Sequence, residues 1–297
     1  MLIGVLFALL AAVMWTGNAC AYACATRRAL PVIPFYALSA VFATAGAAAL
    51  LDWPALVRAP APRELVWPVV VTAGCGIVNT AAMLCQIRAF SLGHQGMTWT
   101  TAQMAMVISF LAGVVVWKEP AQWMQYAGIA AVTATLLLCA AGGKEKAGPP
   151  EERTPGRWLG YVLTALVLTG VAQVLFIVPS RWNLDVPSGL RPVVLLATGA
   201  VCAGGLALVR RGRFQRAMLG PALLLACCSV LGLLFTVRSG DFLAIHHLAG
   251  LVYPISTGAT VVLFALVSRF GLREPFHAST WAGMALGVLG IVLLSTH

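Results

Sequence analysis

Long apolar segments alternate with short polar breaks along the whole chain. A helix needs roughly 20 apolar residues to cross a hydrocarbon core about 30 Å thick. About ten segments reach that length, at approximately 2–24, 32–51, 66–87, 95–117, 122–142, 158–179, 190–209, 217–237, 242–268 and 277–295. The pattern predicts an all-α integral membrane protein with ten transmembrane helices.

One block of sequence occurs twice. The block around Glu119-Pro120 recurs around Glu274-Pro275, and the same offset of 155 residues aligns Gly128 with Gly283 without a gap. In each copy an apolar span ends near a basic residue, Glu-Pro follows, and a glycine lies in the next apolar span. Proline restricts helices and charged side chains prefer water, so each copy reads as helix, aqueous turn, helix. The repetition predicts an internal duplication.

The duplication divides the chain into two five-helix repeats, residues 1–142 and 158–297, joined by a hydrophilic linker at residues 143–157. An odd number of spans per repeat makes the second repeat enter the membrane from the opposite side. The halves are therefore predicted to be inverted repeats, the architecture of many secondary transporters, with a substrate site between them.

Composition supports a lipid environment. Hydrophobic residues make up 60% of the chain and charged residues 9%, with a mean hydropathy of +0.91, whereas a soluble domain carries about 25% charged residues. The net charge of +10 comes from basic residues scattered between the spans, which is typical of orientation signals and not of nucleic-acid binding. We expect a multi-pass protein of the cytoplasmic (inner) membrane, surrounded by lipid, with no nucleic-acid partner.

The basic residues are unevenly shared between the two sets of loops. Loops after odd-numbered spans carry 13 of them and the other loops carry 6, which predicts that both termini lie outside the cell. The eight cysteines all lie in apolar spans and are interpreted as core residues. No metal site or cofactor is predicted.

The polar side chains within the spans that could bind a solute are mostly neutral, because every acidic residue lies at a span end or in a loop. The amides of Asn18, Asn79 and Gln103 are costly to bury in lipid without a partner. They either bond to a neighbouring helix or line a wet cavity that binds a zwitterion or polyol.

The ninth span carries a second set of candidates. His247 is predicted at its start, where it could titrate near neutral pH, or could instead bond to nearby backbone. Tyr253, Ser256, Thr257 and Thr260 follow at helical spacings of three and four, which predicts one polar stripe facing protein or water. The predicted substrate-binding residues are Asn18, Asn79, Gln103, His247, Tyr253 and Thr257.

Several motifs together resemble one family. Trp15-Thr16-Gly17-Asn18 in the first span, Arg88-Ala89-Phe90 after the third, the two Glu-Pro hairpins and Tyr253-Pro254 are similar to the EamA-like branch of the drug/metabolite transporter superfamily. The resemblance implies a secondary carrier that exports or exchanges amino acids or other small metabolites. It also implies eight helices around a central cavity, with the fifth and tenth packed to one side. One departure is Gln103-Met104-Ala105, where relatives commonly place a proline.

The leading hypothesis is therefore a transporter of small polar solutes that works by alternating access. A flippase for lipid-linked molecules is the alternative. A membrane-embedded enzyme is less favoured, since the chain has no HExxH, GxSxG or mid-span carboxylate.

Two structural questions stay open at this point. Glu119 and Glu274 are expected to pair with Lys118, with Arg273 or with a helix N-terminus. The Gly283-xxx-Gly287 spacing favours close helix packing, either in a homodimer or within one chain.

Overall fold

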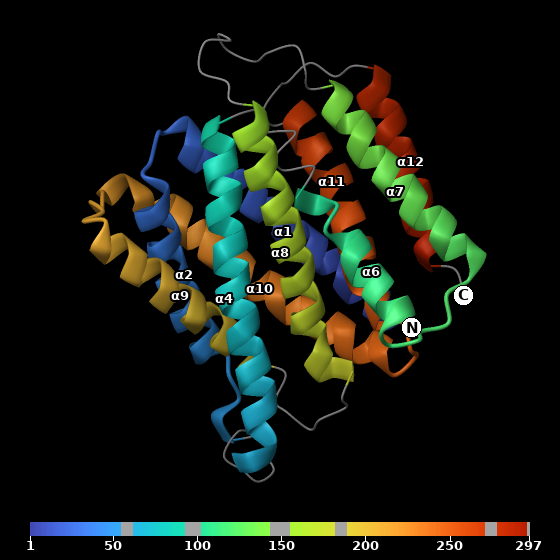
Figure 1. Ribbon diagram of the computed structural model, residues 1–297, viewed down its shortest axis with the longest axis horizontal. Coiled ribbons are helices and arrows are strands. Elements are labelled where there is room, and N and C mark those ends of the chain that lie inside the picture. Colours follow the sequence, from blue (N-terminus) through green and yellow to red (C-terminus); the bar gives the residue numbers. More distant parts are fainter. Residues whose placement is uncertain (55–61, 93–101, 143–154, 182–188, 271–277, 296–297) are drawn as a thin grey trace. The chain divides into compact units, whose positions relative to one another are not determined.

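The chain is all-helical in the part that the structure describes, as the sequence predicts. The computed structural model describes residues 1–54, 62–92, 102–142, 155–181, 189–270 and 278–295 (Figure 1). The α-helices in these ranges are α1 (Leu2–Arg27), α2 (Val32–Ala49), α4 (Pro62–Leu92), α6 (Met106–Val115), α7 (Trp123–Gly142), α8 (Pro155–Arg181), α9 (Leu190–Val209), α10 (Leu219–Ala244), α11 (Val252–Phe270) and α12 (Ala278–Ser295). Two 3-10 helices, η3 (Arg216–Met218) and η4 (Ala249–Leu251), precede α10 and α11.

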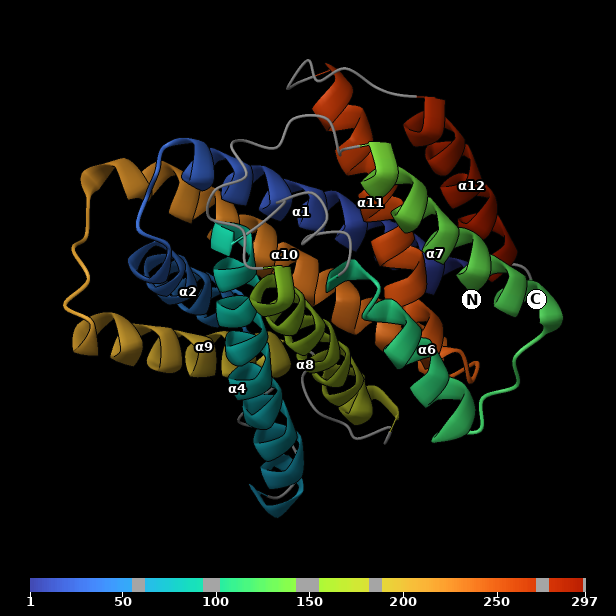
Figure 2. The same cartoon turned by 45° about the horizontal axis from the view of Figure 1, so that its top comes forward.

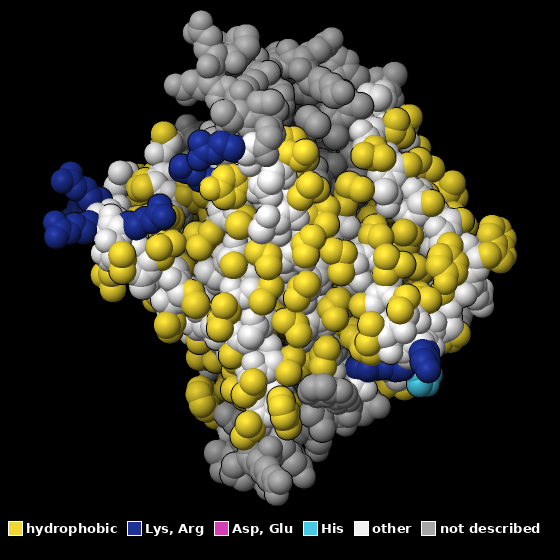
Figure 3. Space-filling model, viewed as in Figure 1, with side chains coloured by type: hydrophobic (Ala, Val, Ile, Leu, Met, Phe, Trp, Pro, Cys, Tyr) yellow, Lys and Arg dark blue, Asp and Glu magenta, His cyan; other side chains and the backbone are white. Residues whose placement is uncertain are grey.

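Many of these helices suit a bilayer. Six in the described ranges are long and apolar enough to cross a membrane, and three shorter apolar helices accompany them. The six spans are Leu2–Tyr22, Val32–Ala49, Leu65–Ala89, Arg157–Arg181, Leu190–Val209 and Arg216–Ala244. Apolar side chains dominate the face shown in Figure 3. Large apolar residues that are exposed among the described residues include Trp67 and Val115. The protein is therefore a multi-pass membrane protein, because such a surface is stable only against lipid.

The chain forms two compact units. Unit 1 contains Met1–Thr80 and Leu175–Ala249, and unit 2 contains Ala81–Val174 and Gly250–His297. Each unit thus combines segments from the first and second halves of the chain.

In unit 1, α1 packs closely along α10 in the opposite direction. A Cβ atom added at Gly4 would lie 2.8 Å from Leu243 Cγ, and one added at Gly17 would lie 2.5 Å from Cys228 Sγ. Residues later in α1 therefore contact residues earlier in α10, as expected for an antiparallel pair. The Ser239 hydroxyl also donates to the Gly4 carbonyl oxygen (2.8 Å). Glycine at these two positions lets the two backbones approach.

Another long contact of unit 1 joins α2 to α9, which lie side by side in Figures 1 and 2. Ala37 on α2 forms a buried cluster with Ala203 and Ala207 on α9. Pro34, near the start of α2, lies against Gly212, just beyond the end of α9. Helices α2 and α9 are therefore also antiparallel, and their alanine side chains allow a short interhelical distance.

In unit 2, α7 and α12 form an antiparallel pair (Figures 1 and 2). A Cβ atom at Gly128 would lie 2.9 Å from the Gly290 carbonyl oxygen and 2.8 Å from Leu294 Cγ. Further along α7, Thr135 Cγ2 would lie 3.0 Å from a Cβ atom at Gly287. Small residues on α12 therefore serve packing within the chain, which was one of the two expectations; the homodimer stays a prediction.

Helix α11 completes this packing from a third side. Gly258 on α11 lies against Val132 of α7 and Ile291 of α12, with a Cβ atom there 3.2–3.3 Å from both side chains. Val132 is fully buried. The centre of unit 2 is thus a glycine-lined junction of three helices.

The predicted boundary between the eighth and ninth spans is wrong. The sequence placed it at residues 238–241, yet α10 continues to Ala244 and α11 starts at Val252. Arg238 and Asp241 are polar and read as a loop, but both lie within the last turns of α10. The helix continues because Arg238 is exposed and Asp241 has a cationic partner.

The fourth span is irregular between residues 102 and 108, even though this stretch contains no proline. The backbone N–H groups of Ala105, Val107 and Ile108 each donate to the carbonyl oxygen three residues earlier (3.0–3.1 Å). This is 3-10 geometry, and α6 proper begins only at Met106. The helix is therefore locally distorted near Gln103-Met104-Ala105, although this chain lacks the proline that relatives commonly place there.

Candidate functional site

The predicted residue Asn18 lies at the contact between α1 and α10. It is buried, with 6% of its surface exposed, and the Ser229 hydroxyl approaches its Oδ1 at 3.5 Å. Of the two roles left open by the sequence, this geometry corresponds to a polar contact with a neighbouring helix. Asn79, in α4 of the same unit, is half-buried.

His247 follows α10 and does not open the ninth span as predicted. Its φ of 56° is left-handed, and the Leu248 N–H donates to the Leu243 carbonyl oxygen (2.9 Å), so His247 occupies the position that ends a helix in a Schellman motif. Its Nδ1 lies 2.8 Å from Arg181 Nη1. Because a guanidinium only donates hydrogen bonds, Nδ1 is the acceptor in this contact.

Unit 2 holds the other three predicted residues. Gln103 is half-buried in the irregular turn before α6. Tyr253 and Thr257 are buried on α11, as are Ser256 and Thr260, so the stripe faces protein. The hydroxyls of Ser256 and Thr260 donate to backbone carbonyl oxygens of their own helix, at 3.3 and 2.7 Å.

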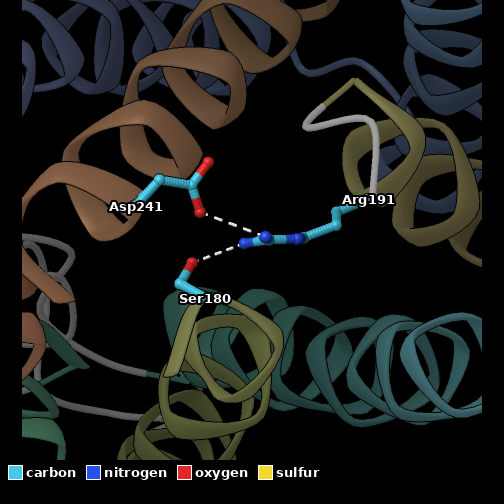
Figure 4. A network of polar contacts seen from close by, with 3 residues as sticks. All are labelled: Ser180, Arg191 and Asp241. Carbon is cyan, nitrogen blue, oxygen red and sulfur yellow. Dashed lines mark hydrogen bonds and ion pairs between the residues drawn. The ribbon is translucent and has the colours of Figure 1, made fainter. Parts of the chain in front are cut away.

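A cluster of charged residues in unit 1 was missed by the sequence analysis. Arg191 in the first turn of α9 donates from Nη2 to Asp241 Oδ1 on α10 (3.0 Å) and from Nη1 to Ser180 Oγ on α8 (2.5 Å) (Figure 4). We call these three residues the Arg191 cluster. Arg191 is buried, with 3% of its surface exposed. One guanidinium therefore connects three helix ends.

Neighbouring residues explain why the three helix ends meet. A Cβ atom at Gly240 would lie 3.1 Å from Ser180 Oγ, so glycine allows α10 to approach α8 at this point. The sequence analysis counted Arg191, at the very start of the seventh predicted span, with the basic residues of the preceding loop, and placed Asp241 at a span end. The available signal was their opposite charge in two loops that the predicted topology puts on the same side of the membrane.

The Glu-Pro motif of the first half has a structural role that the structure makes explicit. Glu119 is buried, and its Oε2 accepts a hydrogen bond from the Gly250 N–H (2.9 Å) within η4, directly before α11. A carboxylate at a helix N-terminus is favourable because the first N–H groups have no partner within the helix. Of the expected partners, the helix N-terminus is correct for Glu119; Glu274 lies outside the described residues.

Close backbone packing surrounds this contact. A Cβ atom at Gly113 would lie 2.7 Å from Glu119 Oε2 and 3.1 Å from Gly250 Cα. At the other side of the turn, the Gln125 side chain accepts a hydrogen bond from the Gln122 N–H (3.1 Å), which completes half of a capping box at the start of α7. The motif thus fixes α7 and α11 relative to α6.

Replacing Glu119 with alanine is expected to lower the free energy of unfolding by about 1–3 kcal/mol, because the buried Gly250 N–H loses its acceptor. Glutamine keeps a carbonyl oxygen and should cost less. Hydrogen exchange of the Gly250 amide measures the effect locally, and faster exchange is expected in Glu119→Ala than in Glu119→Gln. Equal protection of this amide in both variants and the parent protein would contradict the assigned cap.

The contacts described above join Asn18 to Ser229 and His247 to Arg181, and neither joins two of the six predicted residues. The arrangement nevertheless defines a class: an all-helical, multi-pass membrane protein that buries amides, hydroxyls and an ion pair among its helices. Residues 2–141 match the model of the EamA-like transporter family, which belongs to the drug/metabolite transporter superfamily. The family resemblance seen in the sequence is confirmed over these residues.

Comparison of structures agrees on the fold. A crystal structure of another protein matches with a TM-score of 0.75 over 98% of this chain and 98% of its own, at 17% sequence identity. This likeness concerns the fold alone. No curated protein matches the chain in sequence. Members of the EamA-like family are transporters and not enzymes, and the match supports a membrane transporter of small molecules.

Proposed function

We propose that the protein is a secondary transporter that exports or exchanges amino acids or other small polar metabolites across the cytoplasmic membrane by alternating access. The observation that supports this most is the pairing of α2 with α9, of α6 with α11 and of α7 with α12. Each pair joins one predicted span of the first half to its counterpart in the second half.

The direction of the packed helices adds to this support. In the pairs α2–α9 and α7–α12, the two counterparts run antiparallel. Counterpart helices of an inverted repeat must cross the membrane in opposite directions, whereas a parallel duplication would give the same direction. We therefore retain the boundaries 1–142 and 158–297 for the two inverted repeats, with ten spans in total.

The predicted substrate-binding residues keep this role as part of the proposal. They are Asn18, Asn79 and His247 in unit 1 and Gln103, Tyr253 and Thr257 in unit 2. Amide and hydroxyl groups recognise polar solutes without adding a charge to the membrane interior.

The test is transport by the purified full-length protein in liposomes. Labelled amino acids and small polar metabolites are offered outside vesicles preloaded with the same unlabelled solute, and empty liposomes serve as the control. We expect at least one solute to exchange faster than in empty liposomes, with saturation. If none exchanges while another EamA-like carrier is active in the same preparation, the proposal is wrong.

A further inference from the structure

We infer that Arg191 binds an oxyanion group, a carboxylate or a phosphate, of the transported solute, with Asp241 as the counter-ion that holds the guanidinium when no solute is bound. This inference rests on the transport function proposed above and names the chemistry of its substrate. It is carried by the contacts of the Arg191 cluster, all of which lie within unit 1 (Figure 4).

The first argument is the use of the hydrogen-bond donors. A guanidinium has five N–H donors in a rigid plane. Nη1 and Nη2 of Arg191 have Ser180 and Asp241 as acceptors, while the buried Nε has no hydrogen-bond partner among the described residues. An unpaired buried donor is costly, so its retention beside a satisfied ion pair indicates an acceptor that comes from outside the chain.

The shape of the unused donor suits an oxyanion. Nε–H and the adjacent Nη–H of an arginine point in parallel along one edge of its plane, and a carboxylate or phosphate accepts both at once. When no solute is bound, Ser180 and Asp241 bond to the two terminal nitrogens and hold the guanidinium in place, and the Ser180 bond to Nη1 remains when an oxyanion displaces Asp241. The edge that carries Nε is therefore presented in a fixed orientation, which lowers the entropy cost of binding.

The second argument is access. The Arg191 side chain is 4% exposed, but the Asp241 side chain is 32% exposed and lies in the last turn of α10. Solvent therefore reaches the ion pair from the carboxylate side. An incoming oxyanion can compete with Asp241 for the guanidinium there without opening the helix contacts deeper in unit 1.

The Asp241→Asn variant distinguishes an oxyanion site from a cluster that only holds three helix ends together, because the two roles predict opposite effects of added anions on its stability. If the cluster only holds helices together, Asp241→Asn weakens the protein and no anion compensates. If Arg191 is an oxyanion site, Asp241→Asn removes the competing carboxylate. External anions should then bind more tightly and restore stability.

The experiment measures thermal unfolding of the full-length protein in nanodiscs by tryptophan fluorescence. The protein is titrated with succinate, with inorganic phosphate and with uncharged dimethyl succinate. The ionic strength is kept constant with sodium chloride. The first two probes distinguish a carboxylate site from a phosphate site, and the ester controls for effects that do not need a charge. Arg216→Lys, an exposed arginine in η3, is the matched control.

We expect at least one of the two anions, but not the ester, to raise the unfolding temperature of the parent protein and of Arg216→Lys. Arg191→Lys should weaken binding of that anion roughly 10- to 100-fold, since lysine cannot offer the paired donors. Asp241→Asn should bind it about tenfold more tightly. If Arg191→Lys does not fold, the Asp241→Asn titration decides by itself.

Three results would overturn the inference: no stabilisation of the parent by either anion, parent-like affinity in Arg191→Lys, or unchanged or weaker binding in Asp241→Asn. Each leaves the transport proposal intact if neutral or zwitterionic solutes exchange in the liposome assay. Conversely, anion binding with the expected variant pattern but no transport of any solute would remove the transport function and keep the oxyanion site.

Discussion

Asp241→Ala is expected to lower the free energy of unfolding by about 3 kcal/mol. The substitution leaves Arg191 buried with no counter-ion, and an uncompensated buried charge costs several kcal/mol. We place the effect at the lower end of the usual range because the Asp241 side chain is 32% exposed, which lets water solvate part of the site. Equilibrium unfolding in mixed micelles, followed by tryptophan fluorescence, measures the change.

The double variant Arg191→Met/Asp241→Leu is the control for this prediction. Removing both charges together abolishes the uncompensated charge and fills the space with apolar atoms, so most of the lost stability should return. An unfolding free energy for Asp241→Ala equal to that of the parent would show that Arg191 does not depend on this carboxylate. A double variant less stable than Asp241→Ala would show the same.

Hydropathy predicted the helical class because it reports a local property. A run of apolar residues with few charges can satisfy its backbone only within a helix when lipid surrounds it. The same reasoning failed between α10 and α11. The sequence around Arg238 and Asp241 is polar enough to suggest a loop, and only the distant residue Arg191 explains why an acidic residue remains in the helix.

The candidate site was less accessible to sequence reasoning for a related reason. An amide in an apolar span signals a buried polar group, but the identity of its partner is a property of the tertiary fold. Asn18 is approached by Ser229, and Arg191 pairs with Asp241, which lies 50 residues away in the sequence. The repeated Glu-Pro block was more informative because its spacing restricted Glu119 to a few partners, one of which was a helix N-terminus.

The second large expected effect concerns the close packing of α7 against α12 in unit 2. Gly128→Ala should lower the free energy of unfolding by about 1–3 kcal/mol. The added Cβ atom would lie 2.9 Å from the backbone oxygen of Gly290 and 2.8 Å from Leu294 Cγ. Backbone cannot rotate away as a flexible side chain can, so α7 and α12 must separate and lose dispersion contacts along their length.

Gly205→Ala on α9 is the matched control, because nothing lies within 4 Å of a Cβ atom at that position. There the substitution should raise the free energy of unfolding by about 0.5–1 kcal/mol, since alanine favours a helix and glycine does not. Unfolding curves of both variants test the pair directly. If Gly128→Ala were as stable as Gly205→Ala, the close approach of α7 and α12 at Gly128 and Gly290 could not be what holds unit 2 together.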